Sequence, residues 1–250
     1  MNEPIWDAAA LHAPHARADK AARVERMFDA IAPTYERVNA VASLGQDARW
    51  RRRAVDAANV RGGDIVLDIC CGTGDMTRAL AALTPAPQLV LGLDFSAGML
   101  ASGVYTQQSG APIQLLRADG LRLPLADATV DVITCAFGVR NFQNLAAGLR
   151  EMRRVLRPGG RVVILEFSQP RNPLFRWGHH WYTEIILPRL GQWISRDPTN
   201  AYRYLPRSIA TFADVAEFER SLRDAGFGGV RRWSLNLGGV SIYRATPESA

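Results

Sequence analysis

The sequence predicts an α/β fold: a doubly wound, mostly parallel sheet of seven strands that ends in an antiparallel C-terminal hairpin. The first observation is a set of short stretches rich in valine, isoleucine and leucine that alternate with helical patterns. These stretches span residues 64–69, 88–94, 113–117, 130–136 and 161–167, and the helical patterns lie near 74–83, 96–108 and 144–156. Strands that are apolar throughout are typical of a parallel sheet buried on both faces. Their alternation with helices indicates a Rossmann-like arrangement.

The second observation comes from the C-terminal part of the chain. The segments VRRWSLNL and VSIYRAT are separated by Gly238 and Gly239. A Gly-Gly pair between two strand patterns favours a tight hairpin turn. A helix expected over residues 212–225, closed by Gly226, precedes this pair of strands.

We expect one domain over residues 21–250, preceded by a mobile arm over residues 1–20. The arm has no basic segment followed by an apolar run, so the sequence predicts a cytoplasmic protein without a signal peptide. Helices are expected over residues 21–60, with breaks at Pro33 and Gly45. An insertion rich in aromatic residues, over 170–207, is expected to lie over the ligand site.

Composition narrows the classes of partner. The formal net charge is +6, which favours acidic partners or an anionic membrane surface. No basic motif with interleaved aromatic residues is present, so nucleic acid is not expected. No run of eighteen apolar residues is present, so no membrane span is expected. The cysteines Cys70, Cys71 and Cys135 form no CxxC pair, and we expect no metal site.

The glycine turn in VLDICCGTGDMT, residues 66–77, indicates a ligand without phosphate. The turn lacks the lysine that a P-loop requires. A dinucleotide fingerprint would need a third glycine, and Asp75 would repel a diphosphate. S-adenosylmethionine fits better, because it joins an adenosine to a sulfonium and an amino-acid tail and carries no phosphate.

Three acids end the first three predicted strands, where open α/β sheets bind their ligands. Asp68 is expected to neutralise the positive side of the ligand, and Asp94 to accept both ribose hydroxyls. Asp119 is expected to accept from the adenine amino group, while Gly72 and Gly74 let the backbone approach the ligand closely. The alternative is that each acid only caps the helix or turn that follows it.

Three longer segments carry a family resemblance that runs from about Val24 to Tyr243: YERVNAVASLGQDARWRR, AFGVRNFQN and RVLRPGGRVVILEFS. With them, the chain resembles the ubiquinone/menaquinone biosynthesis C-methyltransferases, which are class I S-adenosylmethionine-dependent methyltransferases. It departs from the family pattern at Asp47, where a histidine is usual, and at Ala136, where a serine is common. The resemblance implies the cofactor contacts Asp68, Gly72, Thr73, Gly74, Asp94, Phe95, Asp119, Gly120 and Ala136.

The resemblance also implies the acceptor, a polyprenylated quinol that is methylated on a ring carbon. The product would be menaquinol from demethylmenaquinol, or the equivalent benzoquinol of the ubiquinone pathway. A phenol with a pKa of about 10 is ionised in roughly one molecule in a thousand at pH 7. A cation beside the oxygen lowers the free-energy cost of this ionisation, and Arg140 is the candidate for that cation.

Three other residues are candidates for the reaction. Asn141 is expected to bind the second quinol oxygen, and Tyr35 and Asp119 are candidates for moving the proton. The alternatives are that Arg140 only pairs with Glu166, that Tyr35 is a packed aromatic ring, and that Asn141 is the N-cap of a helix over 142–156.

An acceptor with a long apolar tail favours peripheral contact with the inner face of the membrane. The insertion and the helix around Trp50–Arg53 are the candidate contacts. Alternatives for the insertion are a lid over the site and a homodimer contact, and a quinone-biosynthesis complex is a further candidate partner. The rival functions are an O- or N-methyltransferase, a nicotinamide dehydrogenase and a quinone-binding scaffold without activity.

Overall fold

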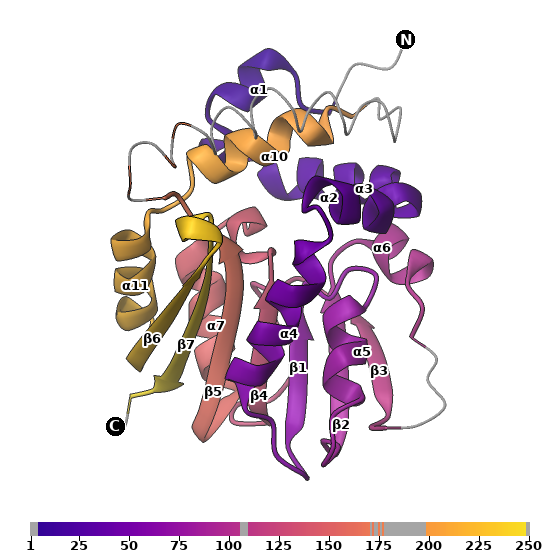
Figure 1. Ribbon diagram of the computed structural model, residues 1–250, viewed down its shortest axis with the longest axis vertical. Coiled ribbons are helices and arrows are strands. Elements are labelled where there is room, and N and C mark those ends of the chain that lie inside the picture. The colour runs from indigo at the N-terminus through magenta and orange to yellow at the C-terminus, as the bar shows by residue number, and fades with distance from the viewer. Residues whose placement is uncertain are drawn as a thin grey trace.

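The computed structural model describes residues 5–105, 110–170, 172, 175, 177 and 199–248. They form a seven-stranded sheet in the order β3-β2-β1-β4-β5-β7-β6 (Figure 1). Strands β1 to β5 are parallel to one another, whereas β7 is antiparallel to both β5 and β6. The predicted fold class, including the antiparallel C-terminal pair, is confirmed.

The strands lie close to their predicted positions. They are β1 Ile65–Ile69, β2 Leu89–Asp94, β3 Ile113–Arg117, β4 Val130–Ala136, β5 Leu156–Phe167, β6 Phe227–Leu235 and β7 Val240–Pro247. Strand β5 begins earlier than predicted because Leu156 already pairs with Val130, before a shift in the register between β4 and β5. The predicted hairpin is confirmed, but its turn is longer than the Gly-Gly pair. The turn η5, Asn236–Gly238, makes the connection, and Asn236 and Leu237 both adopt left-handed backbone conformations.

Alternate residues of each strand pack against different helices. One face meets α7 (Leu145–Val155) and α11 (Val215–Asp224), and the other meets α4 (Gln46–Ala58) and α5 (Asp75–Ala81). Val66 of β1 belongs to the second core cluster and Leu67 to the first, as expected for a strand buried on both faces. Helix α6, Ala97–Ser102, is shorter than the predicted 96–108, because Gly103 leaves the helical conformation.

A cap of helices lies over the carboxyl ends of the parallel strands (Figure 1). It contains α1 (Ala8–His12), α2 (Lys20–Ile31), α3 (Tyr35–Ala42) and α10 (Ala201–Ala210). The predicted breaks are confirmed: Pro33 lies in the turn η2, Ala32–Thr34, and Gly45 precedes α4 with a φ of 71°. None of the helices in the described part of the chain is long and apolar enough to cross a bilayer.

The N-terminal residues take part in this cap. A mobile arm is the sequence-based expectation for residues 1–20. From Ile5 onward the structure shows a packed segment, with Trp6 fully buried and stacked on Tyr204 at 4.2 Å between ring centroids. The Asn200 amide donates to the Trp6 carbonyl, which ties the segment to the start of α10. Most of the predicted insertion, residues 178–198, lies outside the described residues.

Candidate active site

Two adjacent cavities lie at the carboxyl ends of the strands, beneath the helical cap. The larger has a volume of about 460 Å³ and the smaller of about 90 Å³. Phe28, Tyr35 and Phe137 line both cavities, so the two meet at these three aromatic rings. The arrangement provides one chamber for each of two reactants, with a shared boundary between them.

The glycine turn borders the smaller cavity. Cys70, Gly72 and Gly74 all have left-handed backbone conformations, which lets the chain reverse sharply between β1 and α5. The Tyr105 hydroxyl donates to the Gly72 carbonyl and its ring packs against Gly74. Asp75, which follows the turn, pairs with Arg78 at 2.6 Å and lies 3.4 Å from Arg51. The turn therefore lets the backbone lie close to a ligand in the smaller cavity, and Asp75 is already paired with two arginines.

Gly74→Ala is expected to damage the turn severely. A Cβ at Gly74 would lie 2.4 Å from a ring carbon of Tyr105, and the φ of 92° is strained for any residue with a Cβ. We expect a loss of about 2–4 kcal/mol in the free energy of unfolding, read from urea denaturation. Gly63→Ala is the matched control, because its φ of 88° is similar and nothing lies within 4 Å of the added Cβ. Equal losses in both variants would show that Tyr105 does not restrict the turn.

Two of the three strand-end acids line the smaller cavity. The Asp94 carboxylate accepts from the backbone N–H groups of Gly72 and Ser96, both at 2.8 Å. Burial raises the pKa of Asp94, although these N–H groups oppose the shift. Asp119 lines the same cavity and accepts from the backbone N–H of Leu121 at 2.9 Å. Both acids therefore organise their own turns, as the capping alternative predicts, and both also border the cavity.

The third acid is placed differently. Asp68 is 1% exposed and accepts from the hydroxyls of Thr77 and Thr134, both at 2.7 Å. Burial raises its pKa to about 6. Asp68, Thr73 and Gly74 line neither cavity. The other predicted cofactor residues do line the smaller cavity: Gly72, Asp94, Phe95, Asp119, Gly120 and Ala136.

The charges that line the smaller cavity select against phosphate. Its charged lining residues are Glu25, Asp94 and Asp119, and no arginine, lysine or histidine of the described chain lines it. A cluster of carboxylates repels a diphosphate and favours a cationic nucleoside. The lining therefore fits S-adenosylmethionine and does not fit NAD or ATP.

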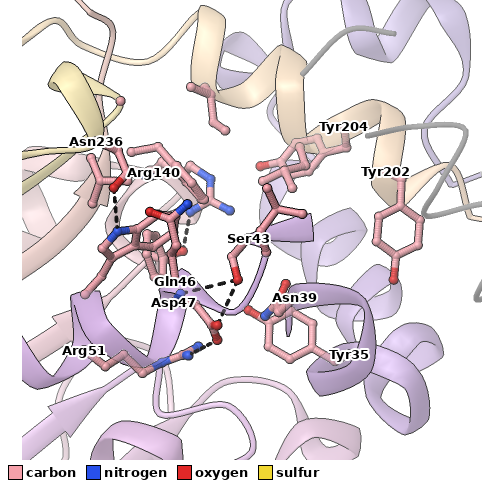
Figure 2. Close-up of a pocket in the computed structure, with 18 of the residues that line it drawn as sticks. Tyr35, Asn39, Ser43, Gln46, Asp47, Arg51, Arg140, Tyr202, Tyr204 and Asn236 are labelled. Atoms are coloured by element: carbon pink, nitrogen blue, oxygen red, sulfur yellow. Dashed lines mark hydrogen bonds and ion pairs between the residues drawn. The ribbon is translucent and has the colours of Figure 1, made fainter. Parts of the chain in front are cut away.

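Arg140 lies in the larger cavity, in the single turn η3, Val139–Asn141 (Figure 2). Its side chain is 6% exposed and pairs at 2.9 Å with Glu166, which is 1% exposed. Burial opposes the charge, but Glu166 outweighs it and holds the pKa of Arg140 above its usual value. The Arg140 Nε is buried and has no hydrogen-bond partner among the described residues. An unpartnered buried donor in a cavity points to an acceptor atom of a ligand.

Tyr35 and Asn141 lie at the boundary of the cavities. Tyr35 lines both, whereas Asn141 lines only the smaller. The Asn141 side chain accepts from the Tyr204 hydroxyl at 2.9 Å and donates to the Phe137 carbonyl at 3.4 Å. The alternative role of Asn141 as a helix N-cap is wrong, because Asn144 caps α7.

A polar cluster at one end of the larger cavity was not identified as a site from the sequence. The Ser43 hydroxyl donates to Asp47 at 2.8 Å, and Arg51 donates to the other Asp47 oxygen at 2.6 Å (Figure 2). Although burial would raise the pKa of Asp47, these two donors hold it below its usual value. The spacing of Asp47 and Arg51 by four residues was the available signal, since it places both charges on one face of α4, whereas Ser43 precedes the break at Gly45.

The strand order, the phosphate-free glycine turn and the acidic smaller cavity together define a class I S-adenosylmethionine-dependent methyltransferase. The chain belongs to the ubiE/COQ5 methyltransferase family, whose model matches residues 16–247. The predicted resemblance and the predicted cofactor are confirmed by this membership.

Curated relatives agree with this family membership, and solved structures agree with the fold. The "Ubiquinone/menaquinone biosynthesis C-methyltransferase UbiE" of Geotalea daltonii is 40% identical over 228 residues, covering 90% of this chain and 96% of the relative. The "Demethylmenaquinone methyltransferase" of Lactiplantibacillus plantarum is 39% identical, covering 90% and 96%. A SAM-dependent methyltransferase from Aquifex aeolicus shares the fold at 17% identity, with a TM-score of 0.55 over 79% of this chain and 89% of the other.

Proposed function

We propose that the protein methylates a ring carbon of a polyprenylated quinol, with S-adenosylmethionine as methyl donor. The observation that carries the proposal is the junction at Phe28, Tyr35 and Phe137, between an acidic cavity and a larger, mostly apolar cavity that contains Arg140. The names of the relatives support demethylmenaquinol or a benzoquinol of the ubiquinone pathway as the acceptor.

The residues of the smaller cavity divide the cofactor between them. Asp94 would accept from the ribose hydroxyls, Asp119 would accept from the adenine amino group, and Gly72 would let the backbone approach the tail. Asp68 would act indirectly, because it fixes Thr77 and Thr134. When bound, S-adenosylmethionine supplies an electrophilic methyl group on a sulfonium.

Arg140 would hold the acceptor oxygen as an oxyanion. A guanidinium stays protonated, so Arg140 cannot remove the proton itself. It favours the ionised form by its charge and by the donor at Nε, which lacks a partner in the described chain. Glu166 keeps the guanidinium in place through its hydrogen bond. An ionised oxygen would raise the electron density on the ortho carbon, which would form its bond to the methyl group as the carbon–sulfur bond breaks and would then lose its ring proton.

Removal of the proton from the acceptor hydroxyl is assigned to a relay that begins at Tyr35. Tyr35 lines both cavities and is close to the acceptor chamber, whereas Asp119 lines only the cofactor chamber. A hydroxyl both accepts and donates, so Tyr35 can pass a proton to water. Asn141, whose amide is engaged with Tyr204 and Phe137, would orient these neighbours instead of binding the second oxygen.

The test is product analysis with a methyl-labelled cofactor. Wild-type protein is incubated with ¹³C-methyl S-adenosylmethionine and reduced demethylmenaquinone carrying a short prenyl tail, and the product is examined by mass spectrometry and NMR. The proposal predicts a ¹³C-methyl group on the quinol ring carbon. A label on oxygen would favour an O-methyltransferase, and transfer only to amine acceptors would favour an N-methyltransferase.

We also propose that the protein docks on the membrane with the mouth of the larger cavity facing the lipid. Leu44 and Leu237 line this cavity, yet their side chains are 75% and 69% exposed. Both have left-handed backbones, with φ of 53° and 56°, a conformation that glycine or asparagine adopts more readily. Leucine at two such exposed turns is therefore better explained by a contact of the side chain than by the needs of the turn.

The predicted anchor at Trp50–Arg53 is revised in this proposal. Trp50 is 7% exposed and donates to the Asn236 side chain, so it is unsuited to contact lipid. Arg49 and Arg52 are exposed on the first turns of α4 and would meet anionic headgroups.

The double variant Leu44→Ser/Leu237→Ser is expected to float poorly with anionic vesicles. Each leucine loses about 1.5–3 kcal/mol of apolar transfer, so partitioning falls at least about 100-fold. Leu115→Ser is the control, because Leu115 is 39% exposed on the edge strand β3 and lines neither cavity. Undiminished flotation of the double variant, or an equal loss in Leu115→Ser, would contradict the docking orientation.

A further inference from the structure

Lys20 is the single lysine of the chain, and its ammonium is buried without an acidic partner in the described part of the chain. It begins α2, is 3% exposed, and donates to the backbone carbonyls of Arg140 at 2.9 Å and Phe142 at 2.5 Å. Burial, together with the nearby Arg140 cation, lowers the pKa of Lys20 to about 8, and no carboxylate contributes to that shift.

Further hydrogen bonds join the start of α2 to the same segment. The Ala21 N–H donates to the Gln143 side chain at 2.9 Å, and that side chain donates to the Arg17 carbonyl at 2.8 Å. On its other side, the Arg140 backbone N–H donates to Glu166 at 3.3 Å. The turn η3 is therefore held between Lys20 and Glu166.

The charge of Lys20 does not serve stability at neutral pH. Its folded-state pKa of about 8 lies below the value of 10.5 for a free side chain. The unfolded chain therefore binds more protons between these two values, and the folded state gains stability as the pH rises from about 8 to 10.5. Below a pH of about 8 the buried ammonium remains a cost to folding. A buried ammonium that lowers stability at neutral pH indicates that the charge of Lys20 has a function other than stabilising the fold.

We propose that Lys20 is a positioning residue whose ammonium holds the carbonyls of Arg140 and Phe142, and so keeps the Arg140 guanidinium in the larger cavity. The clamp links α2, which covers the cofactor cavity through Ala21, to the turn that serves the acceptor. The catalytic consequence rests on the proposed function, because it depends on Arg140 binding the acceptor oxygen.

Two other groups face Lys20 and bear on its pH dependence. Burial lowers the pKa of His15 in η1 (Pro14–Ala16), and Lys20 and Arg140 lower it further, so His15 stays neutral at and above about pH 7. Arg140 in η3 stays charged throughout. The group that titrates near pH 8 is then Lys20, and a neutral amine binds a carbonyl about half as strongly as an ammonium does.

The first test is the pH profile of turnover. Wild-type kcat should fall as the pH rises above about 8. In Lys20→Arg, whose guanidinium stays charged, kcat should not fall over this pH range. Lys20→Met should lower kcat by at least about 10-fold at about pH 7, with S-adenosylhomocysteine affinity changed by less than about 3-fold. Unchanged kcat in Lys20→Met, or the same decrease of kcat above about pH 8 in Lys20→Arg as in wild type, would overturn the proposal. If Lys20→Met does not fold, the comparison of Lys20→Arg with wild type decides.

The second test needs no turnover. Selective labelling of lysine gives one side-chain signal by NMR, since the chain has one lysine. We expect this signal to titrate near pH 8, and the amide signals of Arg140, Asn141 and Phe142 to move with the same midpoint. Amides that stay fixed, or a lysine that titrates near 10.5, would overturn the proposal. If wild type methylates no quinol while the coupled titration is present, the proposed function fails and the clamp stands.

Discussion

Arg140→Ala is expected to reduce turnover by about 1000-fold while the affinity for S-adenosylhomocysteine changes by less than about 3-fold. The ionisation of an isolated phenol at pH 7 costs about 4 kcal/mol, and the variant loses the cation that offsets this cost. Cofactor affinity survives because Arg140 lines only the larger cavity. Single-turnover kinetics and calorimetry measure the two quantities separately.

The variant must be separated from simple loss of folding. Without Arg140, Glu166 is left as an unpaired carboxylate that is 1% exposed, which destabilises a protein by about 3–5 kcal/mol. The double variant Arg140→Met/Glu166→Gln removes both charges and keeps similar volumes. It should fold and still lack turnover, and Arg140→Lys, which keeps a cation, should retain part of it. Turnover of the double variant within about 10-fold of wild type would move the catalytic cation elsewhere.

Asp94→Ala is expected to weaken S-adenosylhomocysteine binding by at least about 10-fold, because a hydrogen bond to a charged acceptor contributes about 1.5–3 kcal/mol. The loss of binding free energy should exceed the contribution of one hydrogen bond. The Asp94 oxygens also hold the N–H groups of Gly72 and Ser96, so the glycine turn and the start of α6 loosen together. Isothermal calorimetry gives the dissociation constant directly.

Asp131→Ala is the matched control for Asp94→Ala. Asp131 also accepts from a strand N–H, that of Ile65 at 2.9 Å, and it pairs with Arg157 at 2.8 Å. It lies at the opposite end of the sheet and lines neither cavity. Its loss should change cofactor affinity by less than about 3-fold. Equal losses in both variants would attribute the effect of Asp94 to general destabilisation.

The strands and the acids at their ends could be predicted from the sequence because the signals are local. A buried parallel strand is apolar over its whole length, and the residue that follows it lies at the carboxyl edge whatever the rest of the chain does. This placed Asp94 and Asp119 correctly beside the smaller cavity. Asp68 instead lies inside β1, one residue before its end, where Thr77 and Thr134 from other elements enclose it.

Features that depend on distant partners could not be predicted in this way. Trp6 is buried by Tyr204, from the far end of the chain, and nothing near Trp6 indicates that contact. Lys20 has a carbonyl partner 120 residues away. The Gly-Gly pair indicated the hairpin, but the turn is longer than that pair, because Asn236 and Leu237 adopt left-handed conformations together with Gly238.

The most direct measurement of the central claim is the ionisation of a phenolic ligand in the acceptor cavity. A naphthol that carries a short prenyl tail is bound in the presence of S-adenosylhomocysteine, and its ultraviolet spectrum is followed against pH. In wild type the bound hydroxyl should ionise about 2 pH units lower than in Arg140→Met/Glu166→Gln. An identical midpoint in the two proteins would contradict the claim that Arg140 holds the acceptor as an oxyanion.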